Sequence, residues 1–436
     1  MVTLESRQLP YSLIKSIFDK RRSWLYLSLA LNLVIHLIFG LLYYNPVDFV
    51  IQFEAAKKIA QGKLLYRDIG EIIVDGLKLQ KPQYPPLYLY SLGSLIALIG
   101  VDTFTWQMAK IFLIVVNLIV GLLLFYIIKT SLNSTSKANS IALVAFNFYL
   151  LNPSTLGIVF GGFHDNFMIL FVLIGFITFK KAFYSLSGTL FGLALLVKPI
   201  AGIYMIPILL WGINTRKLKS IKIWIIAGVT FFLGSLPFLL IVPDVYLNDV
   251  FFIHAQRPDP SMSLYTYFFS KSSTTLLPFL LQFALFLTYS LFFIIKIPIT
   301  NSKNTLEAVT PFMTIFMASN RILYPHYIPF FFPFFTMNIF FLVGENYKRK
   351  FTKNEIYSIF GLIMGLILIY IGAGGFGILW IYEKYETYQS NPLFLITSLS
   401  CILGLIIVSL VSLLLLNYAF FDHNRKIGEI HDERKL

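Results

Sequence analysis

Long apolar runs dominate the chain and decide what it can fold into. Roughly a dozen of them recur along the 436 residues, each near the length of about 20 residues that crosses a bilayer as one α-helix. In lipid, every backbone N–H and C=O must be paired within the protein, which leaves only helices and closed barrels. A barrel would show short segments of alternating polarity instead. The sequence therefore predicts an all-α, polytopic helical membrane protein of about 12 spans.

The composition and the charge agree with a membrane protein. Hydrophobic residues make up 57% of the chain and charged residues 13%, whereas a soluble domain is near half apolar and a quarter charged. The net charge of +14 is first explained by lysine and arginine retained on the cytoplasmic side, so we expect no nucleic-acid partner. The only cysteine, Cys401, forms no intrachain disulfide, and no zinc pattern of cysteine and histidine is present.

Lysine and arginine also set the orientation that we expect. The N-terminal residues 1–23 are basic, and so are four short loops between spans: 129–137, 180–181, 216–219 and 348–350. The positive-inside rule places these loops in the cytoplasm, together with the N-terminus and the polar C-terminal tail. Most acidic residues away from the termini then fall in loops on the outer side. We expect a prokaryotic cell membrane rather than the endoplasmic reticulum.

Several spans have clear predicted bounds: 24–43, 104–128, 138–160, 186–197, 224–242, 356–371 and 394–416. The first is long enough to remain as a span, so we expect no cleaved signal peptide. The run 84–100 is predicted to be partly buried and to return to the outer side. No internal repeat is evident, which speaks against a transporter built from inverted repeats.

A long first outer loop, residues 45–86, is too charged to be a tight turn between spans. Within it, residues 48–61 have apolar side chains at helical spacing and are followed by Gly62, which predicts a helix lying along the membrane interface. Asp48 stands where the first span ends. A carboxylate there is costly unless it is paired or functional, so Asp48 is either a general base or the N-cap of this helix.

Two polar pairs fall in later loops on the same face. His164-Asp165 follows Gly161-Gly162, where the backbone can turn closely, and the acid either belongs to a site or caps the next span. Lys198-Pro199 ends a short apolar run and has no acid next to it in the sequence. Lys198 either binds a phosphate as a point charge or extends to the interface.

Arg257 and His326 are the remaining candidates on this face. Arg257 precedes Pro258-Asp259-Pro260, and it either recognises a phosphate or pairs with Asp259. His326 lies among tyrosines and prolines, where it either hydrogen-bonds a phosphate or sugar or is a satisfied member of an aromatic belt. One acid with several cations suits a reaction that deprotonates a hydroxyl and expels a phosphate. His36, in the middle of a span, is predicted to be structural.

The order of these motifs resembles that of the GT-C superfamily of membrane glycosyltransferases. The matching residues are Asp48, Glu54-Ala55-Ala56, Gly62-Lys63-Leu64-Leu65-Tyr66-Arg67-Asp68, Tyr84-Pro85-Pro86-Leu87-Tyr88, His164-Asp165, Lys198-Pro199 and Pro325-His326-Tyr327. The chain looks most like enzymes that take mannose from a polyprenyl phosphate, including the first mannosyltransferase of glycolipid-anchor synthesis. His164-Asp165-Asn166 stands where an Asp-X-Asp motif would be, which speaks against the oligosaccharyltransferase branch.

The resemblance implies an inverting transfer of a sugar, most simply mannose, from a polyprenyl (dolichyl) phosphate donor to a lipid-linked or glycan acceptor on the extracytoplasmic face. Asp48 would be the catalytic base, and Lys198, Arg257 and His326 would hold the donor phosphate. The other residues expected to contact substrate are His164, Asp165, Arg67 and Tyr84. No cofactor is implied, no metal ligand is assigned, and the metal requirement stays open.

The resemblance covers residues 24–343, which would form a GT-C-like core within a single domain spanning 1–436. Residues 344–416 would add C-terminal spans, and 417–436 would be a cytoplasmic tail. Other interpretations stay open: a transporter or flippase for lipid-linked sugars, a non-enzymatic subunit with the same fold, and a transferase for another sugar such as glucose or an amino-arabinose type.

Overall fold

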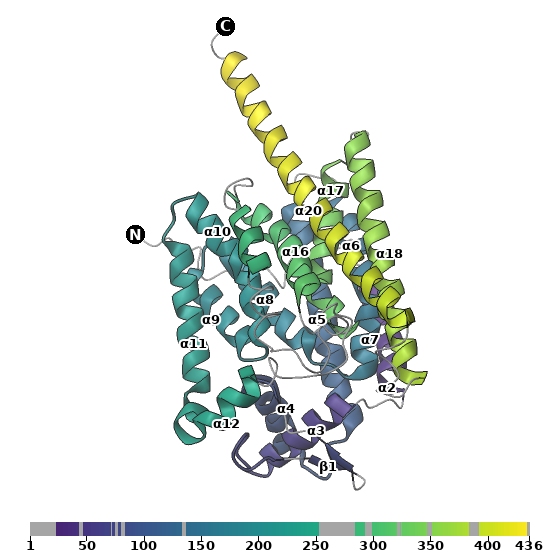
Figure 1. Cartoon of the computed structure of the whole chain (residues 1–436), viewed down its shortest axis with the longest axis vertical. Helices are drawn as coiled ribbons and strands as arrows, with labels where there is room; N and C mark the ends of the chain where they lie inside the picture. Colours follow the sequence, from purple (N-terminus) through teal and green to yellow (C-terminus); the bar gives the residue numbers. More distant parts are fainter. Residues whose placement is uncertain are drawn as a thin grey trace.

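The computed structural model describes residues 23–42, 47–70, 72–74, 77–79, 83–132, 137–252, 284–292, 299–320, 323, 325–346, 351–382 and 392–433. These residues form a bundle of helices, and the elements of the first loop lie together at one end of it (Figure 1). Apart from one short hairpin, the described residues in regular structure are helical. The expected helical class is therefore confirmed in its broad form.

The N-terminal half supplies the centre of the bundle. Its helices are α2 (Ser23–Leu41), α5 (Trp106–Ser131), α6 (Ala138–Leu150), α7 (Pro153–Gly161) and α8 (Asp165–Lys180). Helix α5 packs against α2, α6 and α8, and most of its side chains are buried. One stripe of α5, which includes Ile111 and Val115, remains exposed, so other helices cover most but not all of its apolar surface.

The span predicted over 138–160 is broken, which corrects the single straight helix expected there. Helices α6 and α7 meet at an angle of 49°. Helix α6 ends at Leu150, and Asn152 caps the start of α7, since its side chain accepts from the backbone N–H of Ser154 at 2.9 Å. Pro153 follows at the first position of α7, where the N–H that proline lacks would have no helical partner in any case. The same missing N–H prevents Pro153 from continuing α6.

The second half begins with shorter pieces and ends with long helices. The first group contains α9 (Tyr184–Leu195), the 3-10 helix η2 (Pro199–Met205), α10 (Ile206–Asn214), α11 (Lys219–Ile241), α12 (Pro243–Leu247) and the π-helical turn η3 (Asn248–Phe252). The second group contains α16 (Ser302–Ser319), the 3-10 helix η4 (Pro325–Phe330), α17 (Phe332–Glu345), α18 (Lys353–Tyr382) and α20 (Pro392–Glu433). The residues expected as a polar tail from 417 onward continue α20 as helix, as far as Glu433.

Helices α18 and α20 pack closely against one another where residues 361–372 of the first cross residues 397–411 of the second, and the C-terminal part of α20 extends beyond the bundle (Figure 1). A Cβ atom added at Gly404 would lie 2.5 Å from the carbonyl oxygen of Gly365, so the two backbones meet where both side chains are absent. Small residues at a helix crossing are a common means of association in membranes, because they let two backbones approach.

The first loop folds into α3 (Val47–Ala60), a hairpin of β1 (Ile72–Val74) and β2 (Leu77–Leu79), and α4 (Pro86–Ile99). The helix predicted over 48–61 is confirmed as α3, while its place along the membrane interface stays a prediction, and Gly62 after it has a φ of +83°, as a glycine stop requires. The antiparallel hairpin, with Ile73 opposite Lys78, corrects the expectation of helices alone. Its strands are only three residues long, too short for alternation to be recognised in the sequence.

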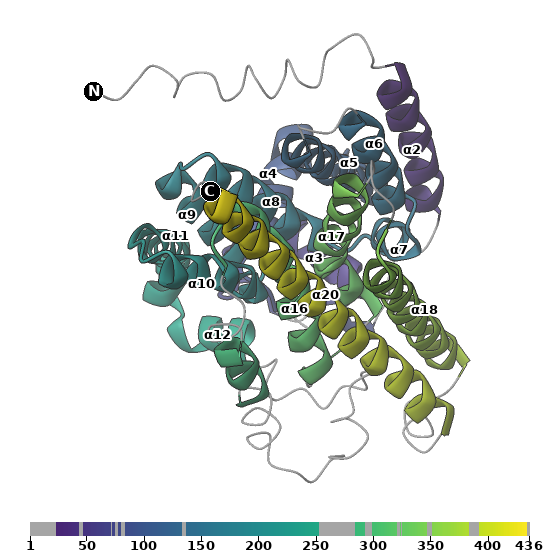
Figure 2. The same cartoon turned by 90° about the horizontal axis from the view of Figure 1, so that it is seen from above.

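Five described helices are long and apolar enough to cross a membrane, or six if α6 and α7 count as one broken span. Helices α2 and α11 lie at opposite edges of the bundle (Figure 2) and carry exposed large apolar side chains such as Trp24, Ile38, Phe232 and Leu240. Water would not favour such surfaces, and lipid does. The chain is thus an integral, multi-pass membrane protein. The predicted number of 12 spans is not confirmed, because α4, α9 and α17 are apolar but shorter.

Candidate functional site

A buried ion pair joins the starts of two helices at the same end of the bundle as the first loop. Nζ of Lys198 lies 2.5 Å from Oδ1 of Asp165, and the two side chains are 8% and 1% exposed. Asp165 begins α8, where a carboxylate is favoured by the helix dipole. Lys198 precedes Pro199 in extended conformation, with φ −150° and ψ 130°, as a residue before proline prefers. Lys198 has no acid next to it in the sequence, but the fold supplies Asp165.

Three aromatic rings surround the ammonium group of Lys198. Its Nζ lies 4.9 Å from the ring centre of Tyr84, 5.3 Å from that of Phe330 and 5.7 Å from that of Tyr327. These distances are typical of cation–π attraction. Tyr84 belongs to the end of the first loop, whereas the other two rings belong to η4. Four segments that are distant in the sequence therefore meet at this lysine.

His164 lies between two tyrosines, Tyr84 at the end of the first loop and Tyr88 in α4. Its ring stacks on Tyr88 with centroids 4.5 Å apart and planes at 15°, and it meets Tyr84 edge-on at 4.8 Å. The side chain is buried, 1% exposed, and the residue occupies the N-cap position of α8 without a capping hydrogen bond from its side chain. Aromatic contacts on two sides fix the plane of the imidazole beside the Asp165–Lys198 pair.

The first loop is tied to this region by hydrogen bonds. The phenol of Tyr66 donates to the carbonyl oxygen of Tyr84, and the amide of Leu87 donates to the carbonyl oxygen of Leu196 at 3.1 Å. The Tyr66 ring also meets Phe238 at 5.2 Å, edge to face. Burial raises the pKa of the Tyr66 phenol well above its usual value, so it stays a donor. These contacts hold Tyr84 against Lys198.

Arg67 pairs with the neighbouring Asp68. Its Nε donates to Oδ1 of the neighbouring Asp68 at 2.8 Å, and its side chain is 55% exposed. Asp68 also accepts from the backbone N–H of Leu64 at 2.8 Å. The Arg67 hydrogen bond and then this amide lower the pKa of Asp68 to about 2. Arg67 and Asp68 therefore stabilise a turn of the first loop. The contact of Arg67 with substrate stays a prediction.

Asp48 approaches the same region through its neighbour in α3. It lies in the first helical turn and is half-buried. Phe49 covers Gly162, where an added Cβ would be 2.5 Å from the phenylalanine ring. Gly162 has a φ of +66° and ends α7 two residues before His164. The start of α3 thus rests on the turn that leads into the buried pair.

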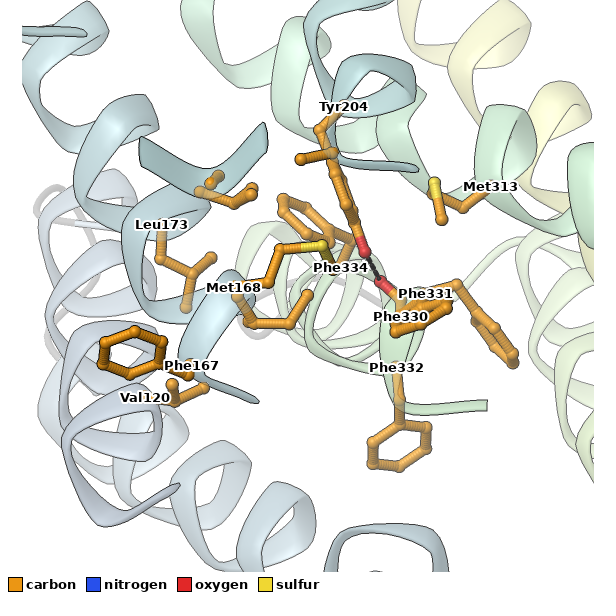
Figure 3. Close-up of a cluster of buried hydrophobic side chains, with 14 of the residues drawn as sticks. Val120, Phe167, Met168, Leu173, Tyr204, Met313, Phe330, Phe331, Phe332 and Phe334 are labelled. Atoms are coloured by element: carbon orange, nitrogen blue, oxygen red, sulfur yellow. Dashed lines mark hydrogen bonds between the residues drawn. The ribbon is translucent and has the colours of Figure 1, made fainter. Parts of the chain in front are cut away.

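The last two predicted residues are placed only in part. Arg257 lies outside the described residues. His326 belongs to η4, whose path is described, but its side chain is not. Tyr327, the next residue, faces Lys198, so the segment that carries His326 reaches the ion pair. Tyr204 of η2 donates to the carbonyl oxygen of Phe330 at 2.7 Å and fixes η4 in the core (Figure 3).

A series of hydrogen-bonded, buried polar side chains begins next to Asp165 and was not predicted from the sequence. Nδ2 of Asn166 donates to Oδ1 of Asn117, and Nδ2 of Asn117 lies 2.8 Å from Nε2 of His36. Nδ1 of His36 lies 2.8 Å from the carbonyl oxygen of Asn32 and must carry the proton, since a carbonyl only accepts. The asparagines within apolar runs could have predicted these contacts, because polar groups in a membrane helix need partners. His36 has a structural role, as predicted, and its partners are Asn32 and Asn117.

Lys110 on α5 is a second buried lysine that sequence reasoning missed. Its Nζ donates to the carbonyl oxygen of Phe160 at 2.9 Å and lies 5.5 Å from the ring centre of Phe49. It therefore links the end of α7 to the start of α3, close to Asp48 in the chain. Among the described residues, no group of three His, Cys, Asp or Glu side chains is placed to hold a metal ion.

No protein-family model matches the chain. The curated protein GPI mannosyltransferase 1 of Saccharomyces cerevisiae is 22% identical over 226 residues, which are 50% of this chain and 50% of the yeast protein. The match thus spans about half the length of that relative. A relative with this name confirms the resemblance to membrane glycosyltransferases.

Two solved structures are also similar to the chain. The structure of ArnT from Cupriavidus metallidurans bound to undecaprenyl phosphate has 14% sequence identity and a TM-score of 0.47, and the similarity covers 91% of this chain and 78% of ArnT. The apo state of ArnT gives 13% identity and the same TM-score, with coverage of 92% and 78%.

Proposed function

We propose that the chain is an inverting glycosyltransferase of the GT-C superfamily that takes its sugar from a polyprenyl phosphate. The observation that carries the proposal is the meeting of its motif segments: Tyr84 and Tyr88, His164-Asp165, Lys198 and Tyr327 lie around one buried ion pair. Chance placement of structural residues would not bring these separate segments to one end of a membrane bundle. The similarity to a yeast protein that is named as a mannosyltransferase also supports the proposal.

Lys198 is the proposed contact for the donor phosphate. Its charge is held by Asp165 and three aromatic rings, so it is fixed in place before a substrate arrives. An ammonium group placed in this way stabilises the negative charge that develops on a leaving phosphate. Arg257 and His326 are proposed as further phosphate contacts. The Tyr84 and Tyr88 rings are proposed to lie along the sugar or the lipid.

Asp48 is the proposed general base. In a single displacement with inversion, the acceptor oxygen attacks the anomeric carbon, the bond to the lipid phosphate breaks, and the acceptor proton passes to a carboxylate. The phosphate leaves as an anion and needs no acid, so one carboxylate is enough, unlike the pair used in glycoside hydrolysis. The link from Asp48 through Phe49 to the turn before His164 supports a place for this carboxylate near the donor.

Mannose is the proposed sugar, and a lipid-linked or glycan molecule is the proposed acceptor. The name of the yeast relative supports mannose. We also propose that residues 24–343 form the catalytic core, that α18 and α20 are additional spans, and that the site faces the extracytoplasmic side of a prokaryotic membrane. The flippase alternative has no support from this relative, which is named as a transferase.

The test is transfer of radiolabelled mannose from a synthetic polyprenyl phosphate mannose by the purified protein in lipid. The D48N variant, a tube with chelator and a tube with the matching glucose donor run in parallel. Label in a lipid or glycan acceptor with the wild type alone supports both the reaction and the base. Release of label to water at equal rates by both proteins contradicts the proposal.

A further inference from the structure

A cavity of about 250 Å³ opens at the opposite end of the bundle from the Asp165–Lys198 pair. It lies between the last turns of α5 and α8 and the start of α16. Asp165 begins α8 and Lys180 ends it, so the two sites are separated by its 16 residues, or about 24 Å of helix. The cavity is therefore a separate feature from the candidate active site.

The cavity has an apolar interior and a basic opening. Phe176, Ile177 and Leu306 line it and are buried. Lys180 is exposed, and Lys181 and Thr130 are half-buried, so these polar side chains form its outer part. Such a division suits a molecule with an anionic head and an apolar chain.

The two lysines are held toward the cavity by neutral partners. Nζ of Lys180 donates to Oγ of Ser131 at 3.0 Å, and Nζ of Lys181 lies 5.6 Å from the ring centre of Tyr126. In the part of the chain that the structure describes, no carboxylate forms an ion pair with either lysine. The nearby acid Glu307 pairs instead with Lys303, at 3.0 Å. Two adjacent cations thus line the cavity, and none of the described carboxylates is paired with them.

We propose that this cavity binds the phosphate of an anionic phospholipid, with Lys180 and Lys181 on the phosphate and the first part of an acyl chain over Phe176 and Ile177. A volume of about 250 Å³ is below that of a pocket for a whole drug-sized molecule, but it admits a head group and a short length of chain. Basic pockets between transmembrane helices on the cytoplasmic side bind such head groups. The positive-inside rule places Lys180 and Lys181 on that side.

The test is native mass spectrometry of the delipidated full-length protein, titrated with dioleoylphosphatidylglycerol or with dioleoylphosphatidylcholine. The two lipids share their chains and differ in head-group charge. The K180Q/K181Q variant removes the cations, and Thr130→Trp fills the outer part of the cavity while keeping them. The control, K217Q/K219Q, makes the same change of charge at the same end of the bundle, where Lys219 lies over Tyr184 at 5.2 Å.

We expect the wild type to retain one phosphatidylglycerol more tightly than phosphatidylcholine, and both test variants to lose this binding about ten-fold or more. The control variant should stay within about two-fold of the wild type, since it leaves the cavity intact. Equal loss in the control, or equal binding of both lipids, would overturn the proposal. So would retained binding in Thr130→Trp, or displacement of the lipid by millimolar inorganic phosphate alone. None of these readouts depends on sugar transfer.

Discussion

Asp165, the first residue of α8, forms an ion pair with Lys198, which directly precedes η2 and lies 33 positions further along the chain. Both side chains are almost fully buried. Removing one partner of such a pair leaves a charge without compensation, whereas replacing both removes the cost of desolvation. The pair is therefore expected to fix the relative positions of α8 and η2 as well as to serve the proposed chemistry.

The coupling between these two residues can be measured. We expect Asp165→Asn and Lys198→Met each to lower the free energy of unfolding by about 3–5 kcal/mol. The double variant should lose less than the sum of the two, because neither charge is then left alone. Thermal or denaturant unfolding in detergent, arranged as a double-mutant cycle, gives this coupling energy. Additive losses would mean that the two charges do not stabilise one another.

Asp48 is expected to be necessary for transfer but not for folding. The change Asp48→Asn keeps the shape and the helix-capping ability of the side chain while removing the base. We expect transfer to fall to background with the melting temperature unchanged. Asp102→Asn is the matched control, because Asp102 is an exposed acid shortly before α5. Near-normal transfer by Asp48→Asn, or equal loss in both variants, would remove Asp48 from its proposed role.

Gly162 is expected to tolerate no side chain. A Cβ there would lie 2.5 Å from the Phe49 ring, and the φ of +66° is unfavourable for other residues by about 1–2 kcal/mol. Gly162→Ala should therefore reduce both stability and transfer, since Asp48 and His164 flank this contact. Gly157, within α7, has no atom within 4 Å of its added Cβ. Gly157→Ala should be neutral or stabilising, and unfolding measurements on both variants make the comparison.

What the sequence could predict follows from how local each signal is. The helix α3 was predictable, because its apolar spacing and Gly62 lie within one short segment. The break at Asn152-Pro153 also had a local signal, a capping residue followed by proline, but the apolar residues on both sides made the segment look like one span. The pairing of Lys198 with Asp165 had no local signal in the sequence, because it depends on the packing of α8 against α9 and η2.

The chain of polar groups behind the site shows the same limit. Each of His36, Asn117 and Asn166 looks isolated in its own run, and only the packing of α2, α5 and α8 makes them partners. Polar residues inside spans predict that partners exist. They do not identify those partners, because the rotation of each helix about its axis is set by the whole bundle.

Asn117 is expected to stabilise this part of the bundle through both ends of its amide. It lies between His36 and Asn166, so Asn117→Leu leaves polar atoms of both without their partner. The expected loss is about 1–3 kcal/mol for each buried group that is left unsatisfied. Val115→Leu, on the exposed side of the same helix, is the control and should change little. Equal melting temperatures of the two variants would contradict a structural role for the polar chain.

The proposed phosphate contacts are expected to affect the donor far more than the acceptor. Lys198→Ala and Arg257→Ala remove cations that would stabilise the leaving phosphate, so kcat for transfer should fall and KM for the polyprenyl phosphate sugar should rise. KM for the acceptor should stay nearly constant. Lys222→Ala, at an exposed position of α11, is the control for loss of a positive charge. Steady-state kinetics with donor and acceptor varied in turn distinguish these effects. Unchanged donor KM and kcat in both variants would refute the phosphate assignment, whereas an equal rise in both KM values would indicate a general distortion of the site.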